Sequence, residues 1–279
     1  MIVKTSEHQA GVSTKSDPTI APQYKPARPA EPLLRLDRIS RHFGKLKAVN
    51  EVTLEMAAGE LRAVIGPNGA GKTTFFNLIS GLHAPTSGRV WFAGQDITDF
   101  SIVRRVALGI VRTFQITEVF PELTVFENIR MGVETAARVN AMPWVSRKTR
   151  AVLDCRVSEL IEIVDLGDKR ASLVGELAHG DQRVVEVAIA LSLRPRLLLL
   201  DEPTAGMGDI ETANMVGLMQ RLHNEQGVSI LFVEHDMDIV FGIAQRITVL
   251  DQGSVLAEGE PDEISANPRV RAAYLGEVE

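Results

Sequence analysis

A glycine-rich stretch, GPNGAGKTT, occupies residues 66–74 and ends in a lysine and two threonines. Glycines let successive backbone N–H groups turn toward phosphate oxygens, and a helix that begins here adds positive partial charge. The spacing G-x-x-x-x-G-K-[ST] predicts that Lys72 reaches the β- and γ-phosphates of a nucleotide and that Thr73 binds Mg²⁺. A plain glycine turn is the alternative, and the strand and helix expected on either side argue against it. The expected nucleotide-binding residues are Gly66, Pro67, Asn68, Gly69, Ala70, Gly71, Lys72, Thr73 and Thr74.

Two acids follow a run of leucines in LLLLDEP, residues 197–203. Such a run predicts a buried strand whose carboxyl end lies beside the phosphate loop. Asp201 can then hold the Mg²⁺ shell, and Glu202 can position or deprotonate an attacking water. The alternative is a buried strand that ends in two solvated acids. The upstream phosphate loop favours the catalytic interpretation.

A third stretch, LAHGDQRVVE at residues 177–186, begins as a loop and continues as an amphipathic helix. It places a histidine, a glycine and an acid where that helix starts. The free N–H groups at a helix N-terminus suit an anion. The stretch is therefore expected to be half of a binding site, with the other half elsewhere.

Short strands alternate with helices from Leu33 onward, which predicts an α/β domain with a mostly parallel sheet. A long middle region without strands suggests an inserted helical subdomain at about 115–190, and a short helical tail is expected at about 261–279. The expected strands cover residues 51–56, 61–66, 89–94, 197–201 and 228–234, with a hairpin at 246–259. The expected helices begin near Lys72 and in the 177–186 stretch, and cover 124–139, 148–164 and 210–224.

The first 32 residues contain five prolines and almost no clustered apolar residues. We expect them to form a disordered tail, because they cannot bury enough surface to offset the entropy of ordering. The net charge of −6 argues against a nucleic-acid partner. A single cysteine, Cys155, suits a reducing compartment. No apolar run reaches the ~18 residues of a membrane span, and no secretory signal is visible. These features favour a soluble cytoplasmic protein.

The order of these motifs resembles that of the ATP-binding subunit of ABC transporters, from about Leu33 to the end of the chain. Two further residues carry the resemblance: Gln115 in IVRTFQ and His235 in LFVEH. The resemblance implies a P-loop ATPase core with an antiparallel β subdomain and an inserted helical subdomain. It implies ATP and Mg²⁺ as ligands, with Gln115 touching Mg²⁺ and water and sensing the membrane partner. It also places His235 near the γ-phosphate and stacks Phe43, in RHFG, on adenine.

In this family the segment LSGGQ of one subunit covers the ATP held by another subunit. LAHGDQ occupies that place here but departs from the pattern at three positions, where Ala178 replaces the serine, His179 the first glycine and Asp181 the glutamine. Gly180 remains, and the serine contact with the γ-phosphate is put in doubt. The resemblance implies a dimer with an identical or related subunit, to which this chain contributes Ala178, His179, Gly180, Asp181 and Gln182.

Several longer segments resemble the ATPase subunits of branched-chain amino acid importers: RTFQITEVFPELTVFENI, LAHGDQR, DEPTAGM and GEPDEISANPRVRAAYLGE. This resemblance implies transmembrane permease subunits as partners and a periplasmic binding protein as an indirect one. It implies a peripheral position on the cytoplasmic face of the inner membrane. Related systems for amides, urea or other small solutes share these segments. The apolar residues Ile116, Val119, Phe120, Leu123 and Phe126 could form the permease contact where they are exposed.

Other functions remain open within and beyond this fold. A lipopolysaccharide-export ATPase resembles the same subfamily. A soluble ABC protein acting on ribosomes or DNA is less favoured, because the chain has one phosphate loop and a short helical region. A kinase or a small GTPase needs neither the LAHGDQ stretch nor His235.

Overall fold

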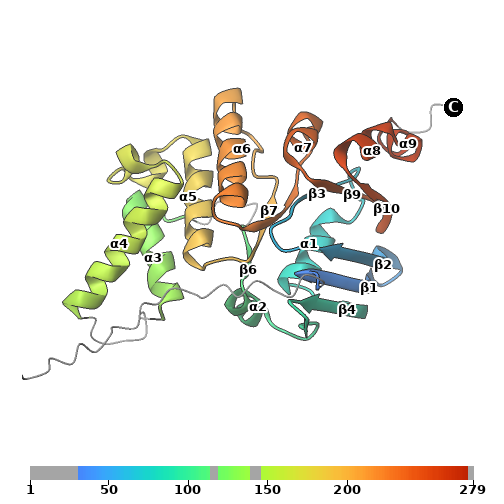
Figure 1. The fold of residues 1–279 in the computed structure, drawn as a ribbon, viewed down its shortest axis with the longest axis horizontal. Coiled ribbons are helices and arrows are strands. Elements are labelled where there is room, and N and C mark those ends of the chain that lie inside the picture. The colour runs from blue at the N-terminus through green and yellow to red at the C-terminus, as the bar shows by residue number, and fades with distance from the viewer. Residues whose placement is uncertain (1–30, 114–118, 139–145, 276–279) are drawn as a thin grey trace, which may run out of the picture. The chain divides into compact units, whose positions relative to one another are not determined.

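The computed structural model describes residues 31–113, 119–138 and 146–275. Within them the strands form a six-stranded and a four-stranded sheet (Figure 1). The six-stranded sheet has the order β10-β9-β3-β8-β7-β6, parallel except for β10. Its strands are β3 (Leu61–Ile65), β6 (Ile110–Arg112), β7 (Leu197–Asp201), β8 (Ser229–Val233), β9 (Arg246–Asp251) and β10 (Ser254–Gly259).

The four-stranded sheet is antiparallel, with the order β2-β1-β4-β5. Its strands are β1 (Leu34–Phe43), β2 (Leu46–Met56), β4 (Ser87–Phe92) and β5 (Gln95–Asp96). The expected mostly parallel sheet with an antiparallel subdomain is therefore confirmed. The described residues from Glu31 onward belong to one compact unit.

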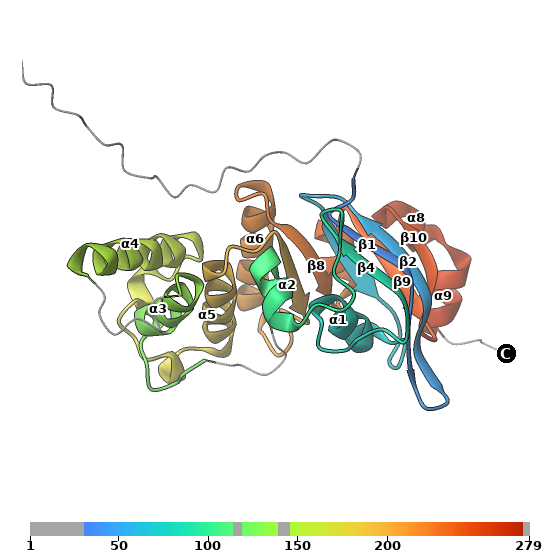
Figure 2. The same cartoon turned by 90° about the horizontal axis from the view of Figure 1, so that it is seen from below.

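The leucine run of β7 is buried on both faces of the six-stranded sheet. Leu197 and Leu199 pack in a core with the four-stranded sheet and with α1 (Lys72–Ser80). Leu198 and Leu200 point to the opposite face, into a core built with helices. Successive side chains of a strand point to opposite faces, so a strand covered on both sides is apolar throughout. Figure 2 shows α1 next to the strands of the four-stranded sheet.

The second core lies on the other face of the parallel sheet and extends into several helices. They include α3 (Val125–Ala136), α4 (Arg147–Ile163), α5 (His179–Ser192), α6 (Asp209–Asn224) and α7 (Met237–Ile243). The described residues between 119 and 192 form helices, two single 3₁₀ turns and one isolated bridge, Thr124 to Leu173. Figure 1 shows α3, α4 and α5 gathered beside α6. The boundaries of the helical subdomain stay a prediction.

The sequence patterns missed five of the described strands and α-helices. The ten-residue strand β1 is interrupted by register shifts, which break its alternation. β5 and β6 are two and three residues long, and α2 (Ile102–Leu108) and α7 each span seven residues. These four elements contain too few repeats for a periodic pattern to stand out. The expected ends of the others shift by one to a few residues, as for α4, which begins at Arg147 and ends at Ile163.

Some predictions fall outside the described residues. These are the disordered tail, except for Glu31 and Pro32, and the residues Gln115 and Ile116. The expected C-terminal helical tail contains α8 (Pro261–Ala266) and α9 (Pro268–Leu275), and its last residues, 276–279, are also outside. Among the described helices, none combines the length and the apolar composition that crossing a membrane requires.

Candidate functional site

The glycine-rich loop connects the carboxyl end of β3 to the first residue of α1. Gly71 caps α1 with a φ of 99°, and a Cβ placed on it would lie 2.2 Å from the carbonyl oxygen of Ala48. A Cβ on Gly66 would lie 2.1 Å from the carbonyl oxygen of Leu250. The loop is thus pressed between β2 and β9, and larger residues do not fit at either end. Its shape is set by the surrounding strands before any ligand arrives.

Lys72 is buried, and its ammonium group turns back into the loop. Its Nζ donates hydrogen bonds to the carbonyl oxygens of Gly66, at 2.6 Å, and Pro67, at 3.1 Å. Burial lowers the pKa of Lys72, whereas the carboxylates of Glu202 and Asp201 act in the opposite direction. Lys72, which is predicted to bind phosphate, and the two predicted acids are therefore neighbours in the folded chain.

Asp201 ends β7 and is buried against a strand that the sequence analysis did not identify. Its Oδ2 lies 2.7 Å from Nη2 of Arg112, the last residue of β6, which also donates to the side chain of Asn77 in α1. β6 is the parallel neighbour of β7, so their carboxyl ends meet. Arg112 links the acid to α1, and only the pairing of β6 with β7 reveals it.

Glu202 and His235 follow neighbouring strands, β7 and β8, and their side chains meet. Nε2 of His235 lies 2.9 Å from Oε1 of Glu202. Glu202 has a φ of 51°, and its N–H donates to the carbonyl oxygen of Val233 at 3.0 Å. A left-handed backbone conformation costs a non-glycine residue ~1 kcal/mol, so the surrounding bonds must hold it. The turn directs the carboxylate toward the histidine.

Glu234 is a buried acid that the sequence analysis overlooked. Its Oε1 accepts hydrogen bonds from N, at 2.9 Å, and Oγ1, at 2.6 Å, of Thr204, and its Oε2 accepts from N of His235 at 3.2 Å. It therefore connects the turn after Glu202 to the backbone of His235. An acid at the end of an otherwise apolar strand was the signal available in the sequence.

Phe43 ends β1 and has 42% of its surface exposed. Its ring meets that of His83 edge-on at 5.6 Å, and the guanidinium carbon of Arg41 lies 4.8 Å from its centroid. The ring is not part of either core. It remains open to stacking by a ligand, which is the role that the resemblance implies.

The LAHGDQ stretch forms the N-terminus of α5, and its side chains contact their own chain. Ala178 and His179 are exposed, whereas Gly180 is buried. Asp181 pairs with Nζ of Lys169 at 2.5 Å, and Nε2 of Gln182 donates to the carbonyl oxygen of Leu177 at 3.0 Å. Both views show α5 well away from α1, so one chain does not bring this stretch to its own phosphate loop (Figures 1 and 2).

The residues predicted to hold Mg²⁺ are only partly within the described chain. Asp201 lies as described above, Thr73 is exposed beside Lys72, and Gln115 falls outside the described residues. The described part of the chain contains no cluster of three or more His, Cys, Asp or Glu residues that could hold a metal. One hydroxyl and one carboxylate suit a Mg²⁺ ion that takes its other ligands from phosphates and water.

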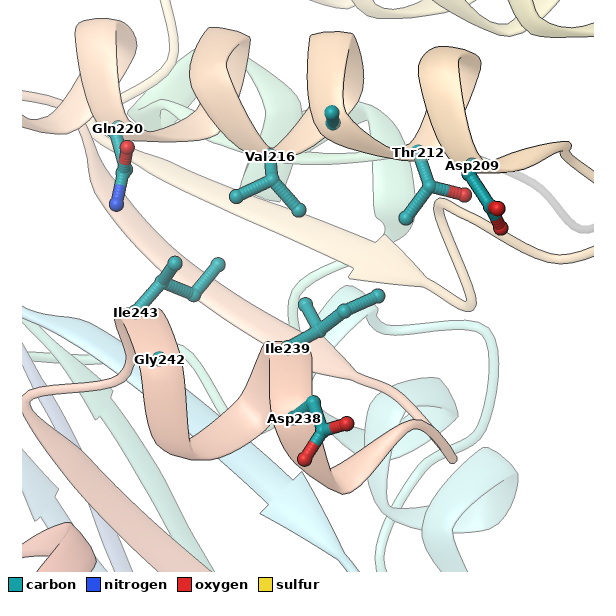
Figure 3. Close-up of a pocket in the computed structure, with 9 residues that line it drawn as sticks. Asp209, Thr212, Val216, Gln220, Asp238, Ile239, Gly242 and Ile243 are labelled. Atoms are coloured by element: carbon teal, nitrogen blue, oxygen red, sulfur yellow. The ribbon is translucent and has the colours of Figure 1, made fainter.

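A groove of about 480 Å³ lies between α6 and α7, away from these residues. Figure 3 shows Asp209, Thr212, Val216 and Gln220 of α6 facing Ile239 and Ile243 of α7 across it. None of the predicted site residues lines the groove.

Comparison with known proteins gives family relationships for most of the chain. The family model described as "ABC transporter" matches residues 49–205. The model described as "Branched-chain amino acid ATP-binding cassette transporter" matches residues 254–279. The chain is 38% identical over 255 residues to the high-affinity branched-chain amino acid transport ATP-binding protein LivG of Escherichia coli (strain K12), covering 89% of this chain and 100% of that protein.

The chain belongs to the ATP-binding cassette family of ABC transporters.

Further similarities agree. BraF of Pseudomonas aeruginosa, a high-affinity branched-chain amino acid transport ATP-binding protein, is 37% identical over 89% of this chain and 100% of its own length. A solved ATP-binding cassette of an ABC transporter superposes with a TM-score of 0.78 and 30% identity, covering 88% of this chain and 99% of that chain. An ADP conformation of such a cassette gives a TM-score of 0.76 and 28% identity, over 88% and 99% of the two chains.

These relationships confirm the expected fold class and the expected activity, which is the ATP hydrolysis of an ABC transporter. They also confirm the resemblance to the branched-chain amino acid subfamily, and they favour it over the lipopolysaccharide-export and ribosome- or DNA-acting alternatives. The roles of individual residues remain predictions that rest on the geometry described above.

Proposed function

We propose that this chain is the ATP-hydrolysing subunit of an ABC importer for branched-chain amino acids or a similar small polar solute. The observation that carries the proposal is the contact between Glu202 and His235, whose Oε1 and Nε2 atoms lie 2.9 Å apart. This contact is at the sheet edge where the charge of Glu202 also acts on the pKa of Lys72. Relatives named for branched-chain amino acid transport, which match along 89% of the chain, support the solute class.

Nucleotide binding rests on the phosphate loop and on the exposed ring of Phe43. Lys72 leaves the carbonyl oxygens of Gly66 and Pro67 and pairs with the β- and γ-phosphates, since an ammonium–phosphate contact is stronger than one to a neutral carbonyl. The backbone N–H groups of residues 66–74 complete the cradle. Phe43 stacks on the adenine ring.

Hydrolysis is assigned to Glu202 as the residue that orients and deprotonates the attacking water. His235 holds the Glu202 carboxylate through their contact and lies beside the γ-phosphate. Glu234 holds the backbone near both residues in place through its hydrogen bonds from Thr204 and from the N–H of His235. Removing one positioned general base typically lowers the rate by ~10²–10⁴.

Magnesium would be held by Thr73, Asp201 and Gln115, and it would neutralise charge on the β- and γ-phosphates when bound. Oδ2 of Asp201 lies 2.7 Å from Nη2 of Arg112. The second carboxylate oxygen, Oδ1, is then the one that would coordinate the Mg²⁺ ion.

The complete site requires a second copy of the chain or a related ATPase subunit. The phosphate loop of one subunit and the LAHGDQ stretch of the other then enclose each nucleotide. The separation of α5 from α1 within one chain supports this arrangement (Figure 2). Contact with the partner's γ-phosphate falls to backbone N–H groups at the start of α5, because Ala178 has no hydroxyl.

The permease contact is assigned to the apolar surface around Phe120, which is 51% exposed. Val119, Leu123 and Phe126 are half-buried beside it. The chain then lies at the cytoplasmic face of the membrane and meets the periplasmic binding protein only indirectly, through the permease.

A reconstitution tests this function. Native membranes are used to identify the transmembrane proteins that co-purify with the chain, and the complex is placed in vesicles with a binding protein. ATP-dependent uptake of leucine, isoleucine or valine is expected, and the Glu202→Gln complex should bind ATP without uptake. ATPase activity without uptake of any of the three would reject the solute class, and no ATPase activity would reject the function.

A further inference from the structure

Three described helices have a glutamate as their third residue, and its carboxylate accepts a hydrogen bond from the backbone N–H of the residue just before the helix. The pairs are Glu127 with Thr124 at 2.9 Å, Glu211 with Gly208 at 3.2 Å, and Glu263 with Glu260 at 3.0 Å. Among these three, Glu211 also reaches a different helix. Its Oε1 accepts from the backbone N of Gly180, in α5, at 3.3 Å.

The packing around Gly180 matches this contact. A Cβ on Gly180 would lie 2.8–2.9 Å from Cβ, Cγ and Cδ of Glu211, so the side chain of the glutamate fills the space next to the glycine. Gly180 is buried, whereas Ala178 and His179 are exposed. The one position of LAHGDQ that keeps the family's glycine is therefore required by a contact within this chain.

Neither helix has a polar side chain at its N-cap position. α5 is preceded by Ala178 and α6 by Gly208. A carboxylate stabilises the positive end of a helix, and its bonds to N–H groups are stronger than neutral ones. Here one carboxylate serves two helix ends, with one oxygen for each.

The two helices lead to the two parts of the proposed site. α5 starts with the stretch that faces the partner's nucleotide. α6 follows the turn that runs from Glu202 through Thr204 to Gly208, and Glu234 holds that turn. The same parts also approach each other at a second point, where a Cβ placed on Gly206 would lie 3.8 Å from Cε1 of His179.

We propose that Glu211 is a positioning residue: its carboxylate ties the start of α5 to the start of α6, so that the LAHGDQ stretch and the turn after Glu202 move together. The proposal rests on the proposed ATPase function for its catalytic consequence. It concerns no contact with the substrate, because Glu211 acts through the backbone of Gly180 and Gly208.

Two matched controls come from the chain itself. Asp209 lies in the same first turn of α6 and carries the same charge, but Figure 3 shows it on the side that faces α7. Asp209→Asn therefore removes charge from this helix end without touching α5. Glu263→Gln removes a capping glutamate of the same kind that serves α8 alone among the described residues.

Hydrogen exchange of the full chain tests the bridge without relying on activity. Glu211→Ala should raise exchange by about tenfold at both Gly180 and Gly208, since each N–H loses a charged acceptor. Glu211→Gln, which keeps one oxygen, should raise it less. Neither control should alter residues 178–182. Faster exchange at Gly208 alone would overturn the proposal, because Glu211 would then cap only its own helix.

Turnover of the complex with its permease tests the consequence. Glu211→Ala should lower kcat about tenfold with KM for ATP unchanged, because the phosphate loop is intact. Glu211→Gln should fall between that variant and the wild type, and it carries the test if the alanine variant fails to fold. Normal turnover in both variants, beside an inactive Glu202→Gln complex, would overturn the inference and leave the function standing. An inactive wild type would instead reject the function, while the exchange experiment would still decide the bridge.

Discussion

The two halves of the proposed site are built in different ways. The phosphate-loop half lies on the ends of β3, β7 and β8, where Lys72, Asp201, Glu202 and His235 are brought together by strand pairing. The LAHGDQ half lies at the start of α5, where contacts within the chain use the polar groups of Gly180, Asp181 and Gln182. The first half needs particular side chains, and the second needs a backbone in the right place.

This difference explains which residues of LAHGDQ depart from the family pattern. The replaced positions 178, 179 and 181 are exposed or half-buried, and the retained Gly180 is buried against Glu211. A helix end offers N–H groups whatever side chains it carries. Side-chain substitutions are therefore expected to cost much in the first half and little in the second.

The largest expected effect is in the phosphate-loop half. Glu202→Gln should lower ATP hydrolysis by ~10²–10⁴, because an amide cannot accept the proton of the attacking water. ATP binding should persist, which equilibrium binding and single-turnover kinetics on the purified complex would measure. Near-normal turnover would remove Glu202 from its assigned role and weaken the contrast between the halves.

A smaller loss is expected when the support of that half is removed. Glu234→Ala leaves the buried N–H of Thr204 without its acceptor, which typically costs about 1–3 kcal/mol. Turnover should fall roughly 10–100-fold if the turn after Glu202 loses its position. Chemical denaturation together with kcat would separate the two consequences. A stability loss with unchanged kcat would show that Glu234 serves the fold alone.

A substitution in the apolar surface around Phe120 should weaken binding to the permease and leave ATP binding unchanged. Phe120→Asp is expected to reduce co-purification with the permease about tenfold, while the isolated subunit keeps its ATP affinity. Val103, which is 78% exposed on α2, provides the matched control as Val103→Asp. Equal loss in both variants would mean that the surface around Phe120 has no special role. An unfolded Phe120→Asp chain would show that the ring supports the fold and not a partner contact.

The smallest effect is expected in the LAHGDQ half. Lys169→Ala removes the partner of Asp181, but the pair is partly exposed, with 46% and 23% of the two side chains accessible. Exposed ion pairs contribute ~0–1 kcal/mol. Turnover should therefore change less than twofold. The free energy of unfolding should fall by no more than about 1 kcal/mol. A large loss of turnover would show that side-chain contacts in this half matter as much as in the first.

The phosphate loop, the acids after the leucine run and the class of fold could be predicted from the amino-acid sequence alone. Each depends on residues that are close in the chain, because a glycine loop between a strand and a helix, or an apolar strand ending in acid, is a local arrangement. The order of these motifs along the chain also indicated the family. Patterns of this kind can be recognised without knowing which strands pair.

The contacts between distant segments could not be predicted, because they depend on how the strands and helices pack. Arg112 reaches Asp201 because β6 pairs with β7, and Glu234 reaches Thr204 because β7 pairs with β8. Glu211 reaches Gly180 across 31 positions because α6 packs beside α5. A single charged residue has no periodic neighbours that reveal its partner, so its role follows from packing, which no local pattern records.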